Sequence, residues 1–176
     1  MYYCDVSRIE IENKMIDSLP SIRKVYVESI TDLTRKKQSI LVWKLLEYAL
    51  NDSFKLVNSE FYLESDGKWN IRNKDVYFSL THSADIVAVA VGTCQLGIDV
   101  EKISEKLLKL QTIFKSSDVE FLALEWTKKE SLFKFKNGNN FSNKKISGLN
   151  GEKYYLTVCS TENAEFLEVS EFLLNE

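Results

Sequence analysis

The spacing of apolar side chains along residues 78–101 predicts two consecutive strands. Residues 86–91 are apolar almost without interruption, which is typical of a buried strand, and a turn is expected at residues 92–93. In the second strand, over residues 96–101, successive side chains point to opposite faces. One face holds Leu96, Ile98 and Val100, and the other holds Gly97, Asp99 and Glu101. The second strand therefore offers one apolar face to a core and one polar face that carries two carboxylates.

The rest of the pattern predicts a mixture of short strands and helices. Strands are expected at residues 2–11, 54–63, 69–71, 76–80, 154–160 and 165–169. Helices are expected at residues 13–19, 22–29 (with Ser21 as its cap), 31–51 and 103–114, and a cap at residues 116–118 precedes a helix that ends at residue 135. A turn at residues 66–67, a polar step at 81–83 and a loop at 138–140 lie between elements. Because the helices and strands do not alternate as regular βαβ units, we expect an α+β fold.

Composition narrows the class of protein. The chain has 176 residues, of which 44% are hydrophobic, and this is enough for a core in one medium domain or two small ones. A net charge of -3 gives no reason to expect a nucleic-acid partner. Cys4, Cys94 and Cys159 fit neither a zinc spacing nor a disulfide framework. With no signal peptide and no apolar stretch of membrane-spanning length, the sequence predicts a soluble cytoplasmic protein without a membrane partner.

Asp99 and Glu101 are the first candidates for chemistry. Two carboxylates two residues apart on one strand face repel each other unless a positive charge lies between them. Hard oxygen ligands of this kind suit Mg²⁺, and Mn²⁺ accepts the same set. The alternative is a solvated strand face with two acidic side chains, and the spacing alone leaves both interpretations open.

A second group of candidates lies in the helix expected to end at residue 135. Trp126, Glu130 and Lys134 are four residues apart and share one face of that helix. Glu130 is a candidate third carboxylate for the same ion, and Lys134 is a candidate ligand of a phosphate that the ion also touches. The alternative is an ordinary Glu–Lys surface pair.

Basic residues near helix starts and a single histidine are candidates for binding phosphate. Arg23 lies in the first turn of one expected helix, and Arg35 and Lys36 belong to a basic patch at the start of the next. His82 stands between two hydroxyl residues immediately before a buried strand. The alternatives are surface solubility for the basic residues and a structural role for the lone histidine.

Four motifs in a fixed order resemble those of the 4′-phosphopantetheinyl transferases, with a closer match to the Sfp type. They are GK at residues 67–68, FSLTHS at 78–83, GIDVE at 97–101 and WTKKESLFK at 126–134. The resemblance implies two similar α+β halves, about residues 1–95 and 96–176, related by a pseudo-twofold axis in a monomer whose site lies between them. This sequence departs from the family at Trp69, Thr81 and Gln38, where proline, serine and arginine are usual.

The resemblance also implies a reaction. The phosphopantetheine arm of coenzyme A passes to a serine of an apo acyl or peptidyl carrier protein, and adenosine 3′,5′-bisphosphate leaves. By the same resemblance, each candidate has a role: Asp99, Glu101 and Glu130 hold Mg²⁺; Lys129 and Lys134 neutralise the pyrophosphate; Lys68, Thr81 and His82 contact phosphates; Arg23, Arg35 and Lys36 lie near the 3′-phosphate; and Asp118 helps to deprotonate the serine.

Two alternatives to the transferase remain at this point. One is a non-catalytic relative that binds coenzyme A or a carrier protein, although the presence of all three carboxylates and Lys134 argues against it. The other is a different magnesium-dependent phosphoryl enzyme, against which the lack of a nucleophilic aspartate motif and of a glycine-rich phosphate loop counts.

Overall fold

The structure, a computed structural model, describes residues 1–65, 67–72, 75–135 and 140–170. Its first half contains β1 (Tyr2–Asp5), α1 (Asn13–Asp17), α2 (Ser21–Ser29), α3 (Leu33–Phe54), β2 (Phe61–Leu63), β3 (Trp69–Ile71), β4 (Tyr77–Ser83) and β5 (Ile86–Gly92). Its second half contains β6 (Gly97–Lys102), the 3₁₀ helix η1 (Glu105–Leu110), α4 (Gln111–Phe114), α5 (Val119–Phe135), β7 (Asn140–Ser147), β8 (Lys153–Ser160) and β9 (Leu167–Glu168). The expected α+β class is confirmed.

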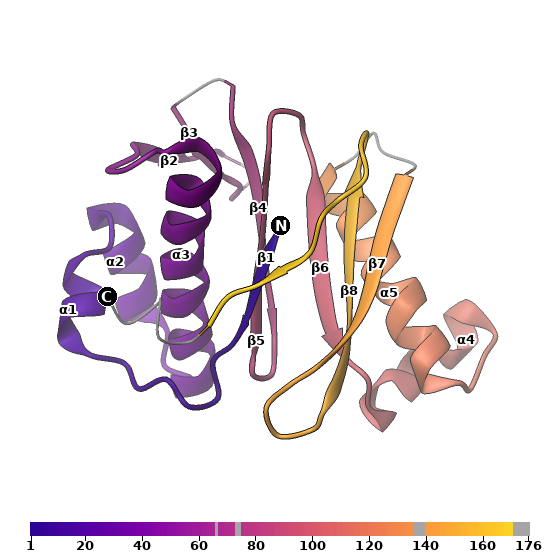
Figure 1. Ribbon diagram of the computed structural model, residues 1–176. Helices are drawn as coiled ribbons and strands as arrows, with labels where there is room; N and C mark the ends of the chain where they lie inside the picture. Colours follow the sequence, from indigo (N-terminus) through magenta and orange to yellow (C-terminus); the bar gives the residue numbers. More distant parts are fainter. Residues whose placement is uncertain (66, 73–74, 136–139, 171–176) are drawn as a thin grey trace.

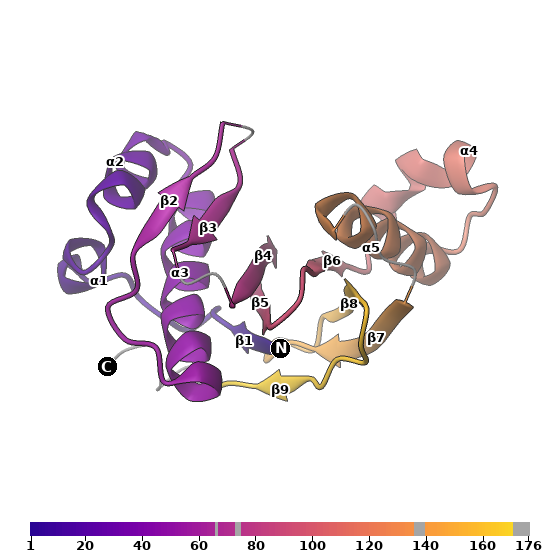
Figure 2. The same cartoon turned by 90° about the horizontal axis from the view of Figure 1, so that it is seen from above.

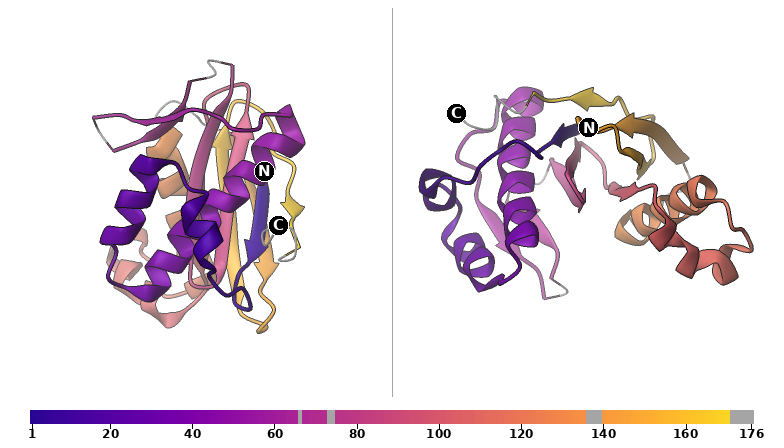
Figure 3. Two further views of the ribbon diagram at one scale, coloured as in Figure 1. Left: turned by 90° about the vertical axis from the view of Figure 1, so that its left-hand side faces the viewer. Right: turned by 90° about the horizontal axis from the view of Figure 1, so that it is seen from below.

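The two halves arrange their main strands in the same way. One sheet has the order β4-β5-β1-β9, and the other has the order β6-β8-β7. The pairs β1–β5, β4–β5, β6–β8 and β7–β8 are all antiparallel. After β8 the chain crosses back to the first half, where β9 pairs in parallel with β1 (Figure 3). A short hairpin of β2 and β3 stands apart from both sheets.

Helices cover the outer sides of the two sheets, and the sheets pack between them (Figures 1 and 2). α1, α2 and α3 lie on one side, and α5 with α4 lies on the other. The alternation in β5 explains this arrangement: Val87 and Val89 join the core under α3, whereas Ile86, Ala88 and Ala90 join a core between the sheets. Ile98 and Val100 of β6 belong to the same inter-sheet core. The polar face of β6 therefore points away from that core, toward α5.

Gly97 allows α5 to lie directly on that polar face. A Cβ atom at this position would come within 2.0 Å of the Ser131 carbonyl oxygen and 3.0 Å of the Lys134 Cβ. Such a close approach of helix to strand is possible only without a side chain. As a result, the helix that carries Glu130 and Lys134 lies against the strand that carries Asp99 and Glu101.

Several boundaries differ from the predicted ones. The prediction of a polar step at residues 81–83 was wrong, because β4 continues through Ser83. The strand predicted at residues 54–63 is limited to β2, because α3 extends to Phe54. Residues 103–114 form η1 and α4 instead of one helix. Ser21 is the first residue of α2, whose N-cap is Pro20, without a side-chain hydrogen bond.

The second half contains one strand that was not predicted. β7 begins at Asn140, which had been assigned to a loop; residues 138 and 139 of that loop lie outside the described residues. Asp66 of the expected turn is also outside them, and Gly67 has the positive φ of 85° that suits a turn. Within the part of the chain that the structure describes, no helix combines the length and apolar character needed to cross a membrane.

Candidate functional site

A cavity of about 560 Å³, here called the junction cavity, lies where the two halves meet. One wall comes from α2, α3 and the β2–β3 hairpin, and the other comes from β4, β6 and α5. Five of the predicted site residues line it: Arg23, Thr81, His82, Asp99 and Lys134. These residues come from four elements that are far apart in sequence, and the fold brings them to one place.

A neighbouring cavity of about 430 Å³ shares Gly67, Trp69, Leu80 and Lys134 with the junction cavity. Lys68, a predicted phosphate ligand, lines this second cavity. The exposed ring of Phe133 lies on its α5 side. The two cavities therefore adjoin, since Trp69 and Lys134 border both.

Lys134 makes contacts to both halves. Its Nζ lies 2.9 Å from Asp99 Oδ1 and donates to the carbonyl oxygens of Ile98, at 2.8 Å, and Leu80, at 3.5 Å. Thr81 donates a further hydrogen bond to Asp99 Oδ1, at 3.0 Å. The pairing of Lys134 with Asp99 was not predicted, since the sequence placed the lysine beside Glu130 and a phosphate.

The three predicted metal ligands affect one another electrostatically. Burial raises the pKa of Asp99, and the charge of Glu130 raises it further against the opposing effect of Lys134. Burial likewise raises the pKa of Glu101, to which the charges of Asp99 and Glu130 add. Burial and the nearby charge of Glu130 therefore both disfavour the ionised forms of Asp99 and Glu101.

The arrangement of these carboxylates has consequences for metal binding. Among the described residues, no group of three or more His, Cys, Asp or Glu side chains is arranged to hold a metal ion. Asp99 instead takes its positive partner from within the protein, in the form of Lys134. The donor chemistry fits a hard divalent cation, because three mutually repelling carboxylates offer only oxygen ligands. Such an ion would compete with Lys134 for Asp99.

Arg23 is a buried cation without an acidic partner among the described residues. Its side chain is only 6% exposed, and it donates to the Ser39 carbonyl and hydroxyl oxygens, at 2.9 and 2.7 Å. The guanidinium carbon lies 4.9 to 5.6 Å from the ring centroids of Trp43, Tyr26 and Trp69. Arg23 Nε has no hydrogen-bond partner. Burial lowers the pKa of Arg23 to about 10, so the group stays charged at neutral pH.

His82 lies at the exposed rim of the junction cavity. Burial of part of the ring lowers the pKa of His82, and the positive charges of Lys134, Arg35 and Arg23 lower it further. Three cations therefore act on one point of the cavity. Such a concentration of positive charge favours a ligand with several negative charges.

The other predicted residues lie outside the two cavities. Arg35 is exposed at the start of α3, where its amide nitrogen donates to Asp32 Oδ1, and Lys36 follows it. Lys129 is exposed, and its Nζ lies over the ring of Trp126, 5.6 Å from the ring centroid. Asp118 is exposed at the start of α5 and accepts hydrogen bonds from the amides of residues 120 and 121. It is twelve residues from Glu130, or about 18 Å along the helix.

The sequence did not indicate which residues of the junction cavity surround Arg23. Tyr26, Ser39 and Trp69 surround the guanidinium of Arg23. Two features of the sequence could have pointed to them: a polar residue, Ser39, next to the apolar positions of α3, and a tryptophan directly after the Gly-Lys pair. Neither signal indicates contact with Arg23 until the fold is known.

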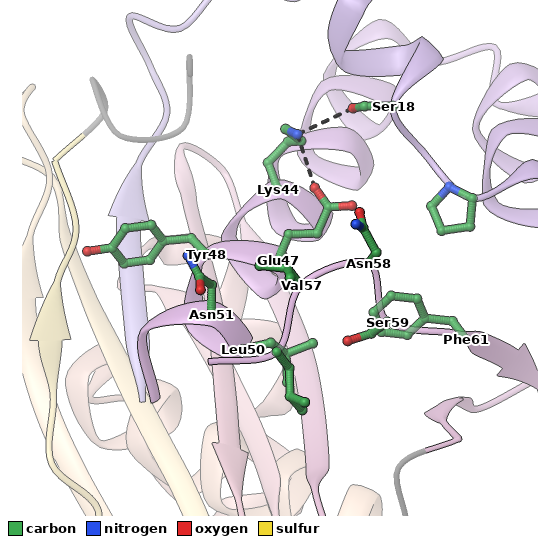
Figure 4. A pocket seen from close by; sticks show the side chains of 12 residues that line it. Ser18, Lys44, Glu47, Tyr48, Leu50, Asn51, Val57, Asn58, Ser59 and Phe61 are labelled. Atoms are coloured by element: carbon green, nitrogen blue, oxygen red, sulfur yellow. Dashed lines mark hydrogen bonds and ion pairs between the residues drawn. The ribbon is translucent and has the colours of Figure 1, made fainter. Parts of the chain in front are cut away.

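A third cavity, of about 580 Å³, lies between α3, the α1–α2 turn and the segment that leads to β2 (Figure 4). None of the predicted site residues lines it. Its lysine, Lys44, is already paired with Glu47 at 3.0 Å and hydrogen-bonded to Ser18 at 3.3 Å. The junction cavity is the stronger candidate, since five of the predicted site residues line it and its buried Arg23 has no carboxylate partner among the described residues.

Comparisons of the chain with known protein families and with curated proteins give no match. The candidate site therefore rests on its own geometry and on the four sequence motifs.

Proposed function

We propose that the protein is a 4′-phosphopantetheinyl transferase that moves the phosphopantetheine arm of coenzyme A to a serine of an apo acyl or peptidyl carrier protein. The observation that carries the proposal is the junction cavity, which Arg23, His82, Asp99 and Lys134 line together. Coenzyme A carries a pyrophosphate and a 3′-phosphate, and this cavity has the opposite charge.

Arg23 supports the phosphate part of the proposal most directly. A buried charge is normally paired, because leaving it unpaired in the protein is costly. Here the guanidinium has aromatic neighbours and Ser39 but no carboxylate among the described residues, and Nε is without a partner. An anionic group of the ligand would complete its coordination. In this proposal that group is the 3′-phosphate.

The reaction requires positioning and charge neutralisation more than covalent chemistry by the enzyme. When bound, Mg²⁺ (or Mn²⁺) would supply positive charge that stabilises the leaving group. Asp99, Glu101 and Glu130 would hold it. The ammonium group of Lys134 would leave Asp99 and pair with the pyrophosphate instead. The serine hydroxyl is the nucleophile and comes from the carrier protein, so the chain itself needs no nucleophile.

The proton of the serine must pass to a base near the reacting phosphate. Glu130 lies one helical turn before Lys134 on the same face of α5. Asp118 already accepts two backbone amides at the start of the helix, far from Glu130. We therefore assign the base role to Glu130 in the proposed mechanism, while Asp118 caps the helix.

The arrangement of the strands supports an internal duplication with pseudo-twofold symmetry. The order β4-β5-β1 in the first half has the same connectivity as β7-β8-β6 in the second, with every pair antiparallel. In each half a long helix, α3 or α5, follows the first strand and precedes the hairpin. The proposed site uses residues of both halves of one chain, which accords with a monomer.

A second candidate is a relative that binds coenzyme A or a carrier protein without catalysis. The observation that favours it is the ion pair between Lys134 and Asp99, which satisfies the carboxylate without a metal ion. Such a protein would bind coenzyme A in the absence of Mg²⁺ and transfer nothing.

One experiment separates the two candidates. The protein is incubated with coenzyme A, Mg²⁺ and an apo carrier protein, and the mass of the carrier is measured. The transferase predicts a gain equal to the phosphopantetheine arm, and no gain when the acceptor serine is replaced by alanine or when Mg²⁺ is chelated. Calorimetry with coenzyme A alone then tests binding, so a protein that binds but does not transfer is recognised as the second candidate.

A further inference from the structure

Three hydroxyl side chains on one face of β4 receive hydrogen bonds from the backbone of β6. Ser79, Thr81 and Ser83 are spaced two residues apart, so they point to the same side of the strand. Their Oγ atoms accept from the amide nitrogens of Ile98, Val100 and Lys102, at 3.3, 3.3 and 3.2 Å. Each contact joins residues nineteen positions apart, so the register is constant along the junction. We call these three residues the hydroxyl ladder.

The hydroxyl ladder joins the two sheets where no backbone ladder does. β6 pairs with β8 on its other edge, and β4 pairs with β5. Buried amides need an acceptor, and Ser79 and Thr81 are only 8% and 7% exposed. The hydroxyl groups supply those acceptors to β6. Because the contacts run through side chains, β4 and β6, both of which the structure describes in full, lie side by side without backbone hydrogen bonds between them.

Two members of the ladder also reach the carboxylates of β6. Thr81 donates to Asp99 Oδ1, at 3.0 Å, while its oxygen accepts from Val100. Ser83 stands in the same register to Glu101 as Thr81 does to Asp99, and its hydroxyl opposes the rise that burial causes in the pKa of Glu101. Ser79 contacts the Ile98 amide and, among the described residues, has no carboxylate partner.

We propose that the hydroxyl ladder is the positioning device of the site: it fixes β6 beside β4, and Ser83 orients Glu101 as Thr81 orients Asp99. Two carboxylates that repel each other would otherwise turn apart. A hydroxyl donor on each holds both toward α5, where Glu130 lies. The link to metal binding rests on the proposed function, whereas the link to strand position does not.

The test uses Ser83→Ala, with Ser79→Ala as the matched control from the same strand and ladder. Hydrogen exchange of single amides is measured by NMR, and the affinity for Mn²⁺ alone is measured by an electron paramagnetic resonance titration. Losing one hydrogen bond should speed amide exchange about fivefold, at Lys102 in Ser83→Ala and at Ile98 in Ser79→Ala. Ser83→Ala should weaken Mn²⁺ binding about fivefold. Ser79→Ala should leave it unchanged, and Ser83→Thr should restore it.

Other outcomes overturn the proposal in distinct ways. Unchanged exchange at Lys102 in Ser83→Ala excludes the ladder contact. Equal loss of Mn²⁺ affinity in both alanine variants reduces the ladder to general support of the fold, and unchanged affinity in Ser83→Ala excludes its role toward Glu101. Should Ser83→Ala not fold, Ser83→Cys, which is close in shape and a weak donor, takes its place.

Failure of the proposed function gives a different result. If the wild-type protein binds no Mn²⁺ at all, the metal part of the proposed function is refuted. The orientation of Glu101 is then read from its side-chain χ1 couplings in the metal-free protein. Ser83→Ala must change those couplings and Ser79→Ala must not, or the positioning role of Ser83 is wrong.

Discussion

Replacement of Lys134 by methionine removes the cation that joins α5 to both β4 and β6. The change keeps most of the apolar stem and deletes contacts to the carbonyl oxygens of Leu80 and Ile98 and to Asp99 Oδ1. It leaves the carboxylate of Asp99 buried, with the hydroxyl of Thr81 as its remaining donor. We therefore expect Lys134→Met to destabilise the metal-free protein as well as to impair any phosphate binding.

The size of the effect follows from the burial of the pair. Removing one partner of a fully buried ion pair costs about 3–5 kcal/mol, because the other charge is left without compensation. Here the side chain of Asp99 is 11% exposed and that of Lys134 is 29% exposed, so water screens part of the interaction. We expect a loss of about 2–3 kcal/mol in the free energy of unfolding. For a chain of this size, that corresponds to a melting temperature lower by roughly 4–12 °C.

A double-mutant cycle measures this coupling directly. Lys134→Met, Asp99→Asn and the double variant are unfolded with urea in the absence of metal, beside Lys129→Met as a control from the exposed face of the same helix. The control should stay within about 0.5 kcal/mol of wild type. A coupling energy of about 1 kcal/mol or more is expected between Lys134 and Asp99. Additive effects, within about 0.5 kcal/mol, would refute the reasoning and make Lys134 a surface residue.

Three further predictions address the surroundings of the cavity. Arg23→Met should leave the free energy of unfolding unchanged or raise it, because the substitution removes a buried charge that has no acidic partner among the described residues. The same variant should bind coenzyme A about tenfold more weakly, or worse, in calorimetry, and unchanged binding would exclude Arg23 from the site. The single histidine gives an unambiguous NMR titration: His82 should titrate below its ordinary pKa of about 6.5 and move upward in Lys134→Met. Since the pKa of His82 is lower in the folded protein, the unfolded chain binds this proton more tightly, and protonation of His82 should destabilise the protein as pH falls through about 6.5. A pKa of 6.5 or above for His82 in the folded protein would contradict the geometry. Gly97→Ala should lower the free energy of unfolding by about 1–3 kcal/mol, since its Cβ would lie 2.0 Å from a backbone oxygen. Gly92→Ala should lower it less, because its Cβ would meet only the flexible end of a leucine side chain at 3.0 Å. Equal losses of stability in thermal melting would be evidence against the close packing of α5.

The strands of the central stretch were predictable because their side chains obey simple periods. Residues 96–101 alternate strictly, so both the strand and its polar face were expected, and β6 spans Gly97–Lys102. The end of β4 shows the limit of this logic. Thr81, His82 and Ser83 were interpreted as a polar step because nothing in the sequence indicates that alternate hydroxyls would receive hydrogen bonds from another strand.

The residues that complete the candidate site depend on long-range contacts. Arg23 was expected near a phosphate, but its aromatic surroundings come from Tyr26, Trp43 and Trp69, the last of which is 46 positions away (69 − 23 = 46). Lys134 was placed beside Glu130 by helical spacing, yet the close packing at Gly97 brings its ammonium group to Asp99. Local periodicity gives the face of an element, and tertiary packing decides which partner that face meets.

The most direct test of the central claim is the intact mass of an apo carrier protein after incubation with coenzyme A, Mg²⁺ and this protein. The account predicts that the wild-type protein adds one phosphopantetheine arm to each carrier and releases an equal amount of adenosine 3′,5′-bisphosphate. It also predicts that Asp99→Ala, if folded as judged by its melting curve, adds almost none, because a proposed ligand of the metal ion is lost. A carrier mass that stays unchanged with wild type, or that rises equally with Asp99→Ala, would contradict it.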